Sequence, residues 1–490
     1  MNKTSLFLFL LINTLLYAQM APSFSGTYPV IENEKWTGIK FELTPQLAFG
    51  SLPSELVKTD YWDWGMPVNP AERVFYLQEQ LEPFFNIKLS GKAGKAGIYM
   101  ELPLQKEYNT RLTDFYSNFF APYDGLLDIS KYSVDMTIPQ LAYIYYQDGP
   151  VFFSIGRYPL KWGDARYPVV VSPVTYQDNL SLVIDNNTVR YSFGIISSFP
   201  YLADKEYDIQ TKCYDEHSTD RIYSEPYKTI ALHRLDIKSD SWRLGIGELN
   251  VIGGKFPDLI DISPVVIFHN TYGEGYSNVL MSLDASIVPI SGLKIYGELA
   301  ADDASFPTTE KGSDYKPGAW AYNIGAEYTK KEWGVWLEYD HTDQWMYTTS
   351  YLPYLHISVR HFYIDNQTAP KRMLAEYPLG FAYGPDADMI SVGGFFNLSD
   401  IQLTAEYNFI IKGTVVDGSV TRWKWLWDGW PTSVVSTDST LIPEALPAGD
   451  DEYINKFYLS ASWKKITLFS WLIAEKNISW LMGINYKIAF

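Results

Sequence analysis

The sequence predicts an all-β fold, a transmembrane antiparallel β-barrel of about 18 strands with short periplasmic turns and long extracellular loops. Three observations predict it. Many segments alternate apolar and polar residues with period two over about 10–12 residues, the length that crosses a bilayer at a tilt. The connections between these segments alternate in length. The chain also begins with a segment typical of export and ends within an alternating segment.

The alternation is clear in residues 278–285, 320–328, 333–340 and 401–411. In the last of these, apolar or aromatic side chains occupy every second position from Ile401 to Ile411, and Gln402, Glu406 and Asn408 lie between them. Successive side chains of a strand point to opposite faces, so each segment has one apolar and one polar face. The expected strands begin near Ile39, Phe84, Ala96, Ser133, Val151, Leu180, Val189, Lys228, Ser241, Asn278, Gly292, Ala319, Glu332, Met389, Ile401, Tyr453, Ile466 and Ile478.

The connections favour a membrane barrel over a soluble sandwich. Most of the short ones have the polar or glycine-containing chemistry of tight hairpin turns, as in Asp148-Gly149 and Ser399-Asp400. The others are Lys92–Lys95, Asp185–Asn187, Ser239-Asp240, Pro289–Ser291, Lys330-Lys331 and Lys464-Lys465. Long connections lie between them, such as Ser51–Pro83, Gln105–Lys131, Tyr201–Tyr227, Gln344–Asp388 and Gly413–Glu452. Weak alternation in Leu180–Ile184 and Ile230–Ile237 leaves about 16 strands as an alternative.

The two ends of the chain fit export to the bacterial outer membrane. Residues 1–18, with Lys3 and the apolar run Leu6–Leu16, read as a signal peptide cleaved after Ala18, and 19–490 as a single barrel domain. An even strand count brings both termini to the short-turn rim. The final "LMGINYKIAF" is then expected to pair with the first strand, so that no edge remains. Phe490 resembles the signal that the outer-membrane insertion machinery reads, which makes that machinery and membrane lipid the expected partners.

Composition excludes several function classes. The net charge of -18 argues against nucleic acid, because binding phosphates needs clustered cations. The single Cys213 excludes an intrachain disulfide. The sequence has no G-x-S-x-G elbow and no H-E-x-x-H spacing, so we expect no catalytic residue, no metal and no cofactor. His341 with Asp343 is the one pair that resembles a base with an orienting acid.

Tryptophan-rich loops indicate contact with saccharide, because a sugar ring has an apolar face that stacks on flat aromatic rings. "RWKWLWDGW" contains Trp423, Trp425, Trp427 and Trp430, and "DYWDWG" contains Trp62 and Trp64 beside carboxylates. The alternative is that these rings belong to the aromatic girdles of the membrane interfaces or to the core of a loop.

One further stretch resembles a known family. "SIGRYPLKWGDARYPVVVSP" (Ser154–Pro173) is followed by "NVLMSLDASIVPISGLKIYGELAADD" (Asn278–Asp303). The order Gly-Arg, Trp-Gly, Ser-Pro loop, LDAS strand and YGE…DD strand resembles the Wzi-type capsule-assembly family. That resemblance implies an 18-stranded outer-membrane barrel that holds capsular polysaccharide in a lectin-like role. This chain has no room before its first strand for the periplasmic helical bundle of the best-known members.

We therefore expect polysaccharide contacts from Arg157, Trp162, Asp164 and Arg166, besides the six tryptophans. Arg157, Trp162 and Asp164 are expected together where a strand leaves the membrane, with an internal ion pair of Arg157 as the alternative role. The acidic chain favours a neutral or weakly charged glycan unless Arg157, Arg166, Arg422 and Lys424 offset the repulsion locally.

Two other functions stay open. A diffusion channel would be lined by the polar faces of the strands. That lining comprises Lys40, Glu42, Lys88, Glu101, Arg190, Lys294, Glu298, Glu327, Glu338, Asp340, Glu406 and Lys487. A structural or adhesin barrel without a small ligand would also suit long external loops.

Overall fold

The computed structural model describes residues 37–51, 85–106, 132–133, 141–173, 177–186, 188–197, 228–253, 259–260, 262–265, 277–303, 319–343, 346–347, 357–363, 372–377, 379–413, 451–475 and 478–490. The regular secondary structure of these residues is all β-strand. No helix in this part of the chain is long and apolar enough to cross a membrane. The expected signal peptide, both tryptophan-rich stretches and Cys213 lie outside the described residues.

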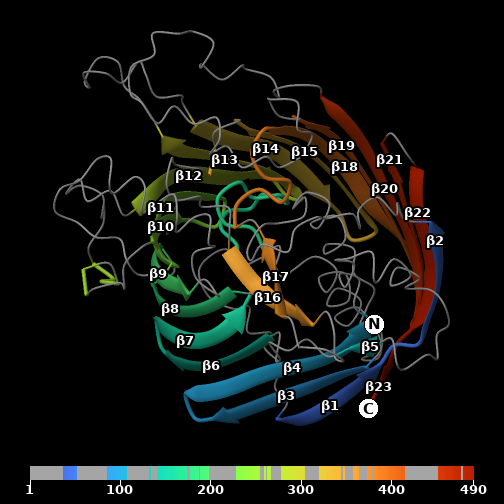
Figure 1. Cartoon of the computed structure of the whole chain (residues 1–490), viewed down its shortest axis with the longest axis horizontal. Coiled ribbons are helices and arrows are strands. Elements are labelled where there is room, and N and C mark those ends of the chain that lie inside the picture. Colours follow the sequence, from blue (N-terminus) through green and yellow to red (C-terminus); the bar gives the residue numbers. More distant parts are fainter. Residues whose placement is uncertain are drawn as a thin grey trace.

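The strands are β1 (Gly38–Leu43), β2 (Gln46–Ser51), β3 (Phe85–Ala93), β4 (Ala96–Lys106), β5 (Tyr132–Ser133), β6 (Leu141–Asp148), β7 (Val151–Tyr158), β8 (Gln177–Asp185), β9 (Val189–Ser197), β10 (Lys228–Lys238), β11 (Trp242–Gly253), β12 (Ser277–Ile290), β13 (Leu293–Asp303), β14 (Ala319–Thr329), β15 (Trp333–Thr342), β16 (Ile357–Tyr363), β17 (Arg372–Tyr377), β18 (Ala387–Leu398), β19 (Ile401–Lys412), β20 (Glu452–Trp463), β21 (Ile466–Ala474), β22 (Ile478–Tyr486) and β23 (Ile488–Ala489). All of them except β16 and β17, which form a separate pair, belong to one antiparallel sheet that curves into a ring (Figure 1).

Without its two-residue strands β5 and β23, the large sheet has 19 strands. β1 and β2 are two parts of one strand, because Glu42 lies opposite Ala489 and Gln46 lies opposite Asn485 in one unbroken register. The described chain therefore crosses the wall 18 times, as the sequence predicts. The last strand pairs with the first, and the backbone N–H of Phe490 donates to the Phe41 carbonyl at 2.9 Å. The closing strand expected from "LMGINYKIAF" is thus confirmed as part of the ring.

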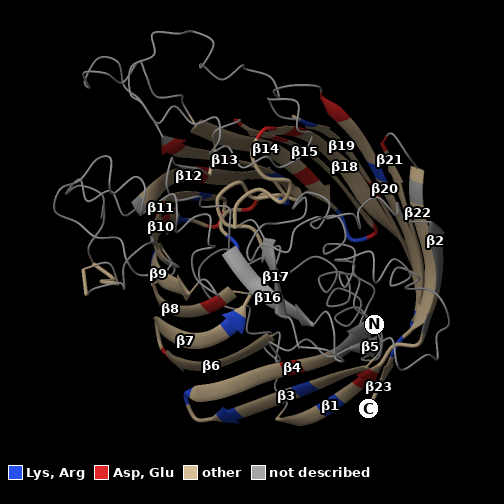
Figure 2. Ribbon diagram, in the orientation of Figure 1, with Lys and Arg blue, Asp and Glu red and all other residues tan. Residues whose placement is uncertain are grey.

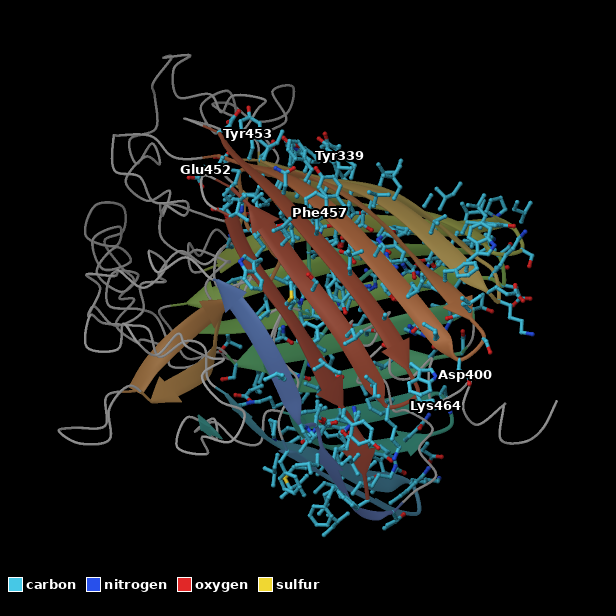
Figure 3. All side chains as sticks on the ribbon, turned by 90° about the vertical axis from the view of Figure 1, so that its right-hand side faces the viewer. Tyr339, Asp400, Glu452, Tyr453, Phe457 and Lys464 are labelled. Atoms are coloured by element: carbon cyan, nitrogen blue, oxygen red, sulfur yellow. The ribbon has the colours of Figure 1, made fainter. Side chains whose placement is uncertain are left out.

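All eight short connections expected from the sequence are tight turns between paired strands. Ser399 and Lys464 adopt φ values of 55° and 53°, and Gly149 adopts 55°, the left-handed conformation that a two-residue hairpin requires. In Figure 3, Asp400 and Lys464 mark the turn end of the barrel, and Glu452 and Tyr453 lie at the opposite end.

Both weakly alternating segments are confirmed as strands, and one other expected strand begins elsewhere. Residues 177–185 and 228–238, which alternate weakly, are both strands of the wall, so the alternative of about 16 strands is wrong. The strand expected from Ser133 begins at Leu141 instead, and residues 132–133 form only the short strand β5.

The wall is apolar outside and polar inside, the reverse of a soluble protein. Outward-facing Ile324 and Leu337 are 60% and 56% exposed, whereas inward-facing Asn323 and Glu338 on the same strands are buried. Exposed Leu403 alternates in the same way with buried Gln402 on β19. A ring of exposed aliphatic and aromatic side chains that alternates with a polar lining is the surface that lipid covers in a membrane barrel.

Candidate functional site

Two segments of the chain lie inside the ring of strands (Figure 1). We call residues 159–173, which follow β7, the first inward segment, and residues 379–386, which precede β18, the second inward segment. The backbone N–H of Ser172 donates to the carbonyl of Leu379 at 2.7 Å, which joins the two. The Tyr347 hydroxyl donates to the Val169 carbonyl at 2.6 Å and accepts the N–H of Phe381 at 3.1 Å, a second link between them.

An apolar cluster fills the space between these segments and the wall. Trp162 and Val170 from the first segment and Phe381 from the second are fully buried. The wall contributes inward-facing apolar side chains from strands on both sides of the segments. They are Ile196, Ile230, Leu232, Leu249, Val251, Leu280, Ala300, Ala319, Ala321, Ala387, Met389, Ile410 and Ile454. The polar lining of the lumen is therefore interrupted where the inward segments pack.

Two glycines of β11 make room for side chains in the lumen: Gly247 for Trp162 of the first inward segment, and Gly245 for Arg234 of the wall. A Cβ at Gly247 would lie 2.4 Å from the Trp162 ring, and one at Gly245 would lie 2.1 Å from Nη2 of Arg234. The Arg234 guanidinium carbon lies 5.4 Å from the centroid of the Trp162 ring. Gly245 and Gly247 stand two residues apart and so face the lumen together. This period-two glycine pair in "LGIGEL" is a signal of the close approach that the sequence reasoning did not use.

A network of buried charges holds the turn-side end of the same segment. Arg234 pairs with Asp236 and Asp284, both at 2.7 Å, and Arg243 pairs with Asp284 at 2.7 Å. Asp164 joins through Arg243 at 2.7 Å. Acidic and basic positions are interspersed along the strands rather than separated by sign (Figure 2). Such a network is costly to break, because removal of one partner leaves an uncompensated buried charge.

Asp164 is the member of this network that lies on the first inward segment. Burial raises the pKa of its carboxyl group, but the opposing attraction of Arg243 and then of Lys294 is stronger, so the pKa falls to about 2. The carboxylate is therefore ionised at neutral pH. It anchors the segment to β11.

Carboxylates of the wall also hold the backbone of the first inward segment. Glu338 on β15 accepts the N–H groups of Arg166 at 2.8 Å and of Tyr167 at 2.7 Å. Glu298 on β13 accepts the N–H of Val169 at 2.8 Å. The Arg166 guanidinium carbon lies 3.7 Å from the centroid of the Trp336 ring, a close cation–π contact. Glu298 and Glu338, expected as channel lining, thus satisfy backbone donors that the segment's irregular path leaves open.

The expected grouping of Arg157 with Trp162 and Asp164 is wrong. Arg157 forms a bidentate pair with its cross-strand neighbour Asp178, with both contacts at 2.7 Å, at the end of β7 farthest from the turn at Gly149. It lies on the face of β7 opposite to buried Tyr158, so it points away from the lumen, whereas Trp162 and Asp164 lie inside it. Its alternative role as an ion pair is observed, on the outer rather than the lumen face.

His341 does not have the geometry of a general base. Its Nδ1 lies 2.8 Å from Asp388 and its Nε2 lies 3.0 Å from Asp343, so both ring nitrogens face carboxylates. An imidazole held on both sides in this way has no lone pair directed at a substrate. Within the described part of the chain, no group of three or more His, Cys, Asp or Glu side chains could hold a metal ion.

No protein-family profile and no curated protein matches this chain. Among solved structures it is similar in fold to Wzi of Escherichia coli, described as a carbohydrate-binding β-barrel involved in group 1 capsule assembly. The TM-score is 0.50 at 12% identity, over 98% of this chain and 87% of Wzi. OccK3 of Pseudomonas aeruginosa gives 0.43 at 7% identity, over 92% of this chain and 95% of its own. OprD of the same organism gives 0.41 at 9% identity, over 92% and 94%. These likenesses show the fold alone.

The closed antiparallel ring and its exposed apolar outer surface decide the location. Closed barrels are the one β-architecture that satisfies every backbone hydrogen bond within lipid. The protein is a β-barrel of the bacterial outer membrane. Membrane lipid is therefore in contact with its outer surface.

Proposed function

We propose that this protein holds a polysaccharide at the cell surface in a lectin-like role and passes little or no solute. The observation that carries the proposal is the apolar cluster inside the lumen. The lumen of an open porin is polar and filled with water. Here Trp162, Val170 and Phe381 pack against inward-facing apolar residues of the wall. A barrel whose interior is packed with apolar side chains is better suited to bind a ligand at its outer end than to conduct solutes.

The position of the family-like motifs supports the same proposal. "WGDARYPVVVSP" is the first inward segment itself, and "LDAS" and "YGE" belong to β12 and β13. These stretches contact each other, because Asp284 belongs to the charge network that holds Asp164, and Glu298 accepts the Val169 N–H. The motifs that resemble the Wzi-type family therefore build the part of the lumen that the first inward segment occupies. Wzi, to which the fold is similar, is described as carbohydrate-binding.

The described candidate residues divide by accessibility. The Trp162 side chain is fully buried, and Asp164 and Arg166 are engaged by the wall, so we propose that these three hold the inward segment. The side chains of Arg157 and Asp178 keep 17% and 41% of their surface exposed at a strand end, where a glycan can reach them. Trp62, Trp64, Trp423, Trp425, Trp427 and Trp430 remain proposed stacking surfaces.

The chemistry of a polymer makes weak contacts sufficient. A long polysaccharide presents many repeats, so modest stacking at each ring is multiplied by effective concentration. A neutral or weakly charged glycan fits a chain of net charge -18 best.

The test replaces Trp423, Trp425, Trp427 and Trp430 together by Ala in cells that carry the polysaccharide. We expect the variant to assemble normally and the polysaccharide to be shed into the medium. Heat-modifiable migration on gels verifies assembly. Arg157→Ala is measured alongside for glycan retention and for heat stability. If the tryptophan variant assembles and the cells keep their polysaccharide at the wild-type level, the proposal fails.

One observation favours the diffusion channel as a second candidate. Across the closing seam, Lys487 and Lys88 pair with Glu42 at 3.5 Å and 3.4 Å, and Lys88 pairs with Glu101 at 3.5 Å. These lumen-facing side chains keep 17–23% of their surface exposed, so water reaches this side of the interior. A conductance measurement separates the two candidates.

A further inference from the structure

The apolar outer surface is incomplete on strands β9–β11. Near the turn rim, the outward-facing side chains of β10 and β11 are apolar and exposed, as elsewhere on the wall; they are Leu235, Ile237, Trp242, Leu244 and Ile246. Farther along the same outward face, His233, Glu248 and Asn250 are buried, and His233 stands opposite Glu248 across the strand pair. We call these three residues the polar seat. Charged and amide side chains facing lipid are costly, so the seat requires a cover.

A short segment of the chain contacts Tyr191, which neighbours this seat. Residues 259–260 and 262–265, which we call the strap, lie outside the ring beside β9 (Figure 1). The Tyr191 hydroxyl, on the outward face of β9, donates to the Pro264 carbonyl and lies 3.0 Å from Nδ1 of His233. The strap therefore reaches the seat through Tyr191.

The strap presents apolar side chains on its exposed side. Leu259, Ile260 and Val265 are 82%, 56% and 80% exposed. Two of its backbone donors are satisfied within the strap: the Ser263 N–H donates to the Ile260 carbonyl at 3.2 Å, and the Val265 N–H donates to the Ser263 hydroxyl at 3.4 Å. A segment that has local backbone hydrogen bonds, a polar contact toward the wall and exposed apolar side chains is suited to a lipid boundary.

We propose that the strap is part of the lipid-facing surface of the barrel. It covers the polar seat and completes the apolar outer surface there. Leu259, Ile260 and Val265 then contact the acyl chains of the membrane. The occupant is assigned to lipid because the strap lies next to an apolar surface that faces lipid, which includes Leu235 and Ile246. Leu235 is the cross-strand neighbour of Tyr191, which holds the strap. A second copy of the chain is the competing occupant.

The test places an environment-sensitive nitrobenzoxadiazole label on the strap of the full chain. Cys213, the single cysteine, is first replaced by Ser, and Val265→Cys or Leu259→Cys then supplies the attachment point. The protein is reconstituted in phosphatidylcholine vesicles with or without nitroxide-labelled lipid, and iodide serves as the water-soluble quencher. Ile246→Cys reports the belt, and Asp400→Cys in an exposed turn reports water.

We expect the strap labels to be quenched by nitroxide lipid as Ile246→Cys is, and to be shielded from iodide. Quenching by iodide to the level of Asp400→Cys overturns the proposal. Shielding from both quenchers, with crosslinking between copies through the strap cysteine, overturns it in favour of a protein contact. Adding Tyr191→Phe removes the donor to Pro264, so lipid quenching at Val265→Cys should fall while that at Ile246→Cys stays the same.

Discussion

The Glu298 carboxylate on β13 accepts a hydrogen bond from the backbone N–H of Val169 at 2.8 Å, and so ties the first inward segment to the wall. Glu298 is fully embedded between wall and segment and also accepts from Asn323 at 3.1 Å. A buried acceptor of this kind stabilises an irregular segment, because a backbone donor left without a partner inside the barrel is costly.

Glu338→Gln should loosen the first inward segment. The wild-type carboxylate accepts two backbone N–H groups, one on each oxygen, whereas an amide has a single acceptor oxygen and turns an N–H₂ group toward the other donor. We expect the barrel to assemble but residues 159–173 to become more accessible to protease. Glu101→Gln, on the lumen face of β4 across the barrel, is the matched control. Equal protease resistance of Glu338→Gln and wild type contradicts the assigned role.

Gly247→Ala should destabilise the folded protein by roughly 1–3 kcal/mol, the usual cost of overpacking. The added Cβ would lie 2.4 Å from the Trp162 ring and 2.7 Å from the Ser282 hydroxyl, so the indole must move. Denaturant unfolding of the purified protein in detergent measures the change. Gly91→Ala serves as the control, because its Cβ would meet only a methyl group of Ile98 at 3.2 Å. A Gly247→Ala protein as stable as the control would show that Trp162 is not packed as described.

Asp164 should make the attachment of the inward segment sensitive to acid. Its pKa is lowered from 3.8 to about 2 in the folded protein, so its contribution to stability is complete above the unfolded value. That contribution is lost as the pH falls through the folded value. We expect thermal stability to decline from about pH 4 to about pH 2, and to decline less in Asp164→Asn, which is already less stable at neutral pH. Parallel pH profiles for the two proteins would contradict this.

The sequence predicts the wall well because strand geometry is local. Period-two alternation and turn chemistry depend on residues that are neighbours in the sequence. The eight tight turns and the closing pair of strands could therefore be predicted from the sequence alone. Ile230 and Leu232 looked like broken alternation because both face inward onto the apolar cluster, where a polar residue was expected. Their partners are the inward segments, which lie far away in the sequence.

The grouping of Arg157 with Trp162 and Asp164 could not be predicted correctly, because it depends on contacts between residues far apart in the sequence. Trp162, Asp164 and Arg166 have the residue types of a saccharide site. The same residue types also suit a segment that is held against the wall by packing and ion pairs. Which role they take depends on contacts such as Arg166 with Glu338, across 172 positions of the chain. No local pattern contains that pairing. The local signal nearest to these contacts is Gly247, which leaves room for the Trp162 ring against β11.

Planar-bilayer conductance of the purified wild-type protein tests the central claim most directly. The claim is that the inward segments pack against the wall and obstruct the lumen, and that the protein acts by holding polysaccharide at its outer end. We predict no stable open-channel steps at neutral pH. Steady ohmic conductance of the size of a general porin, recorded with the inward segments intact, would contradict the claim and favour the diffusion channel.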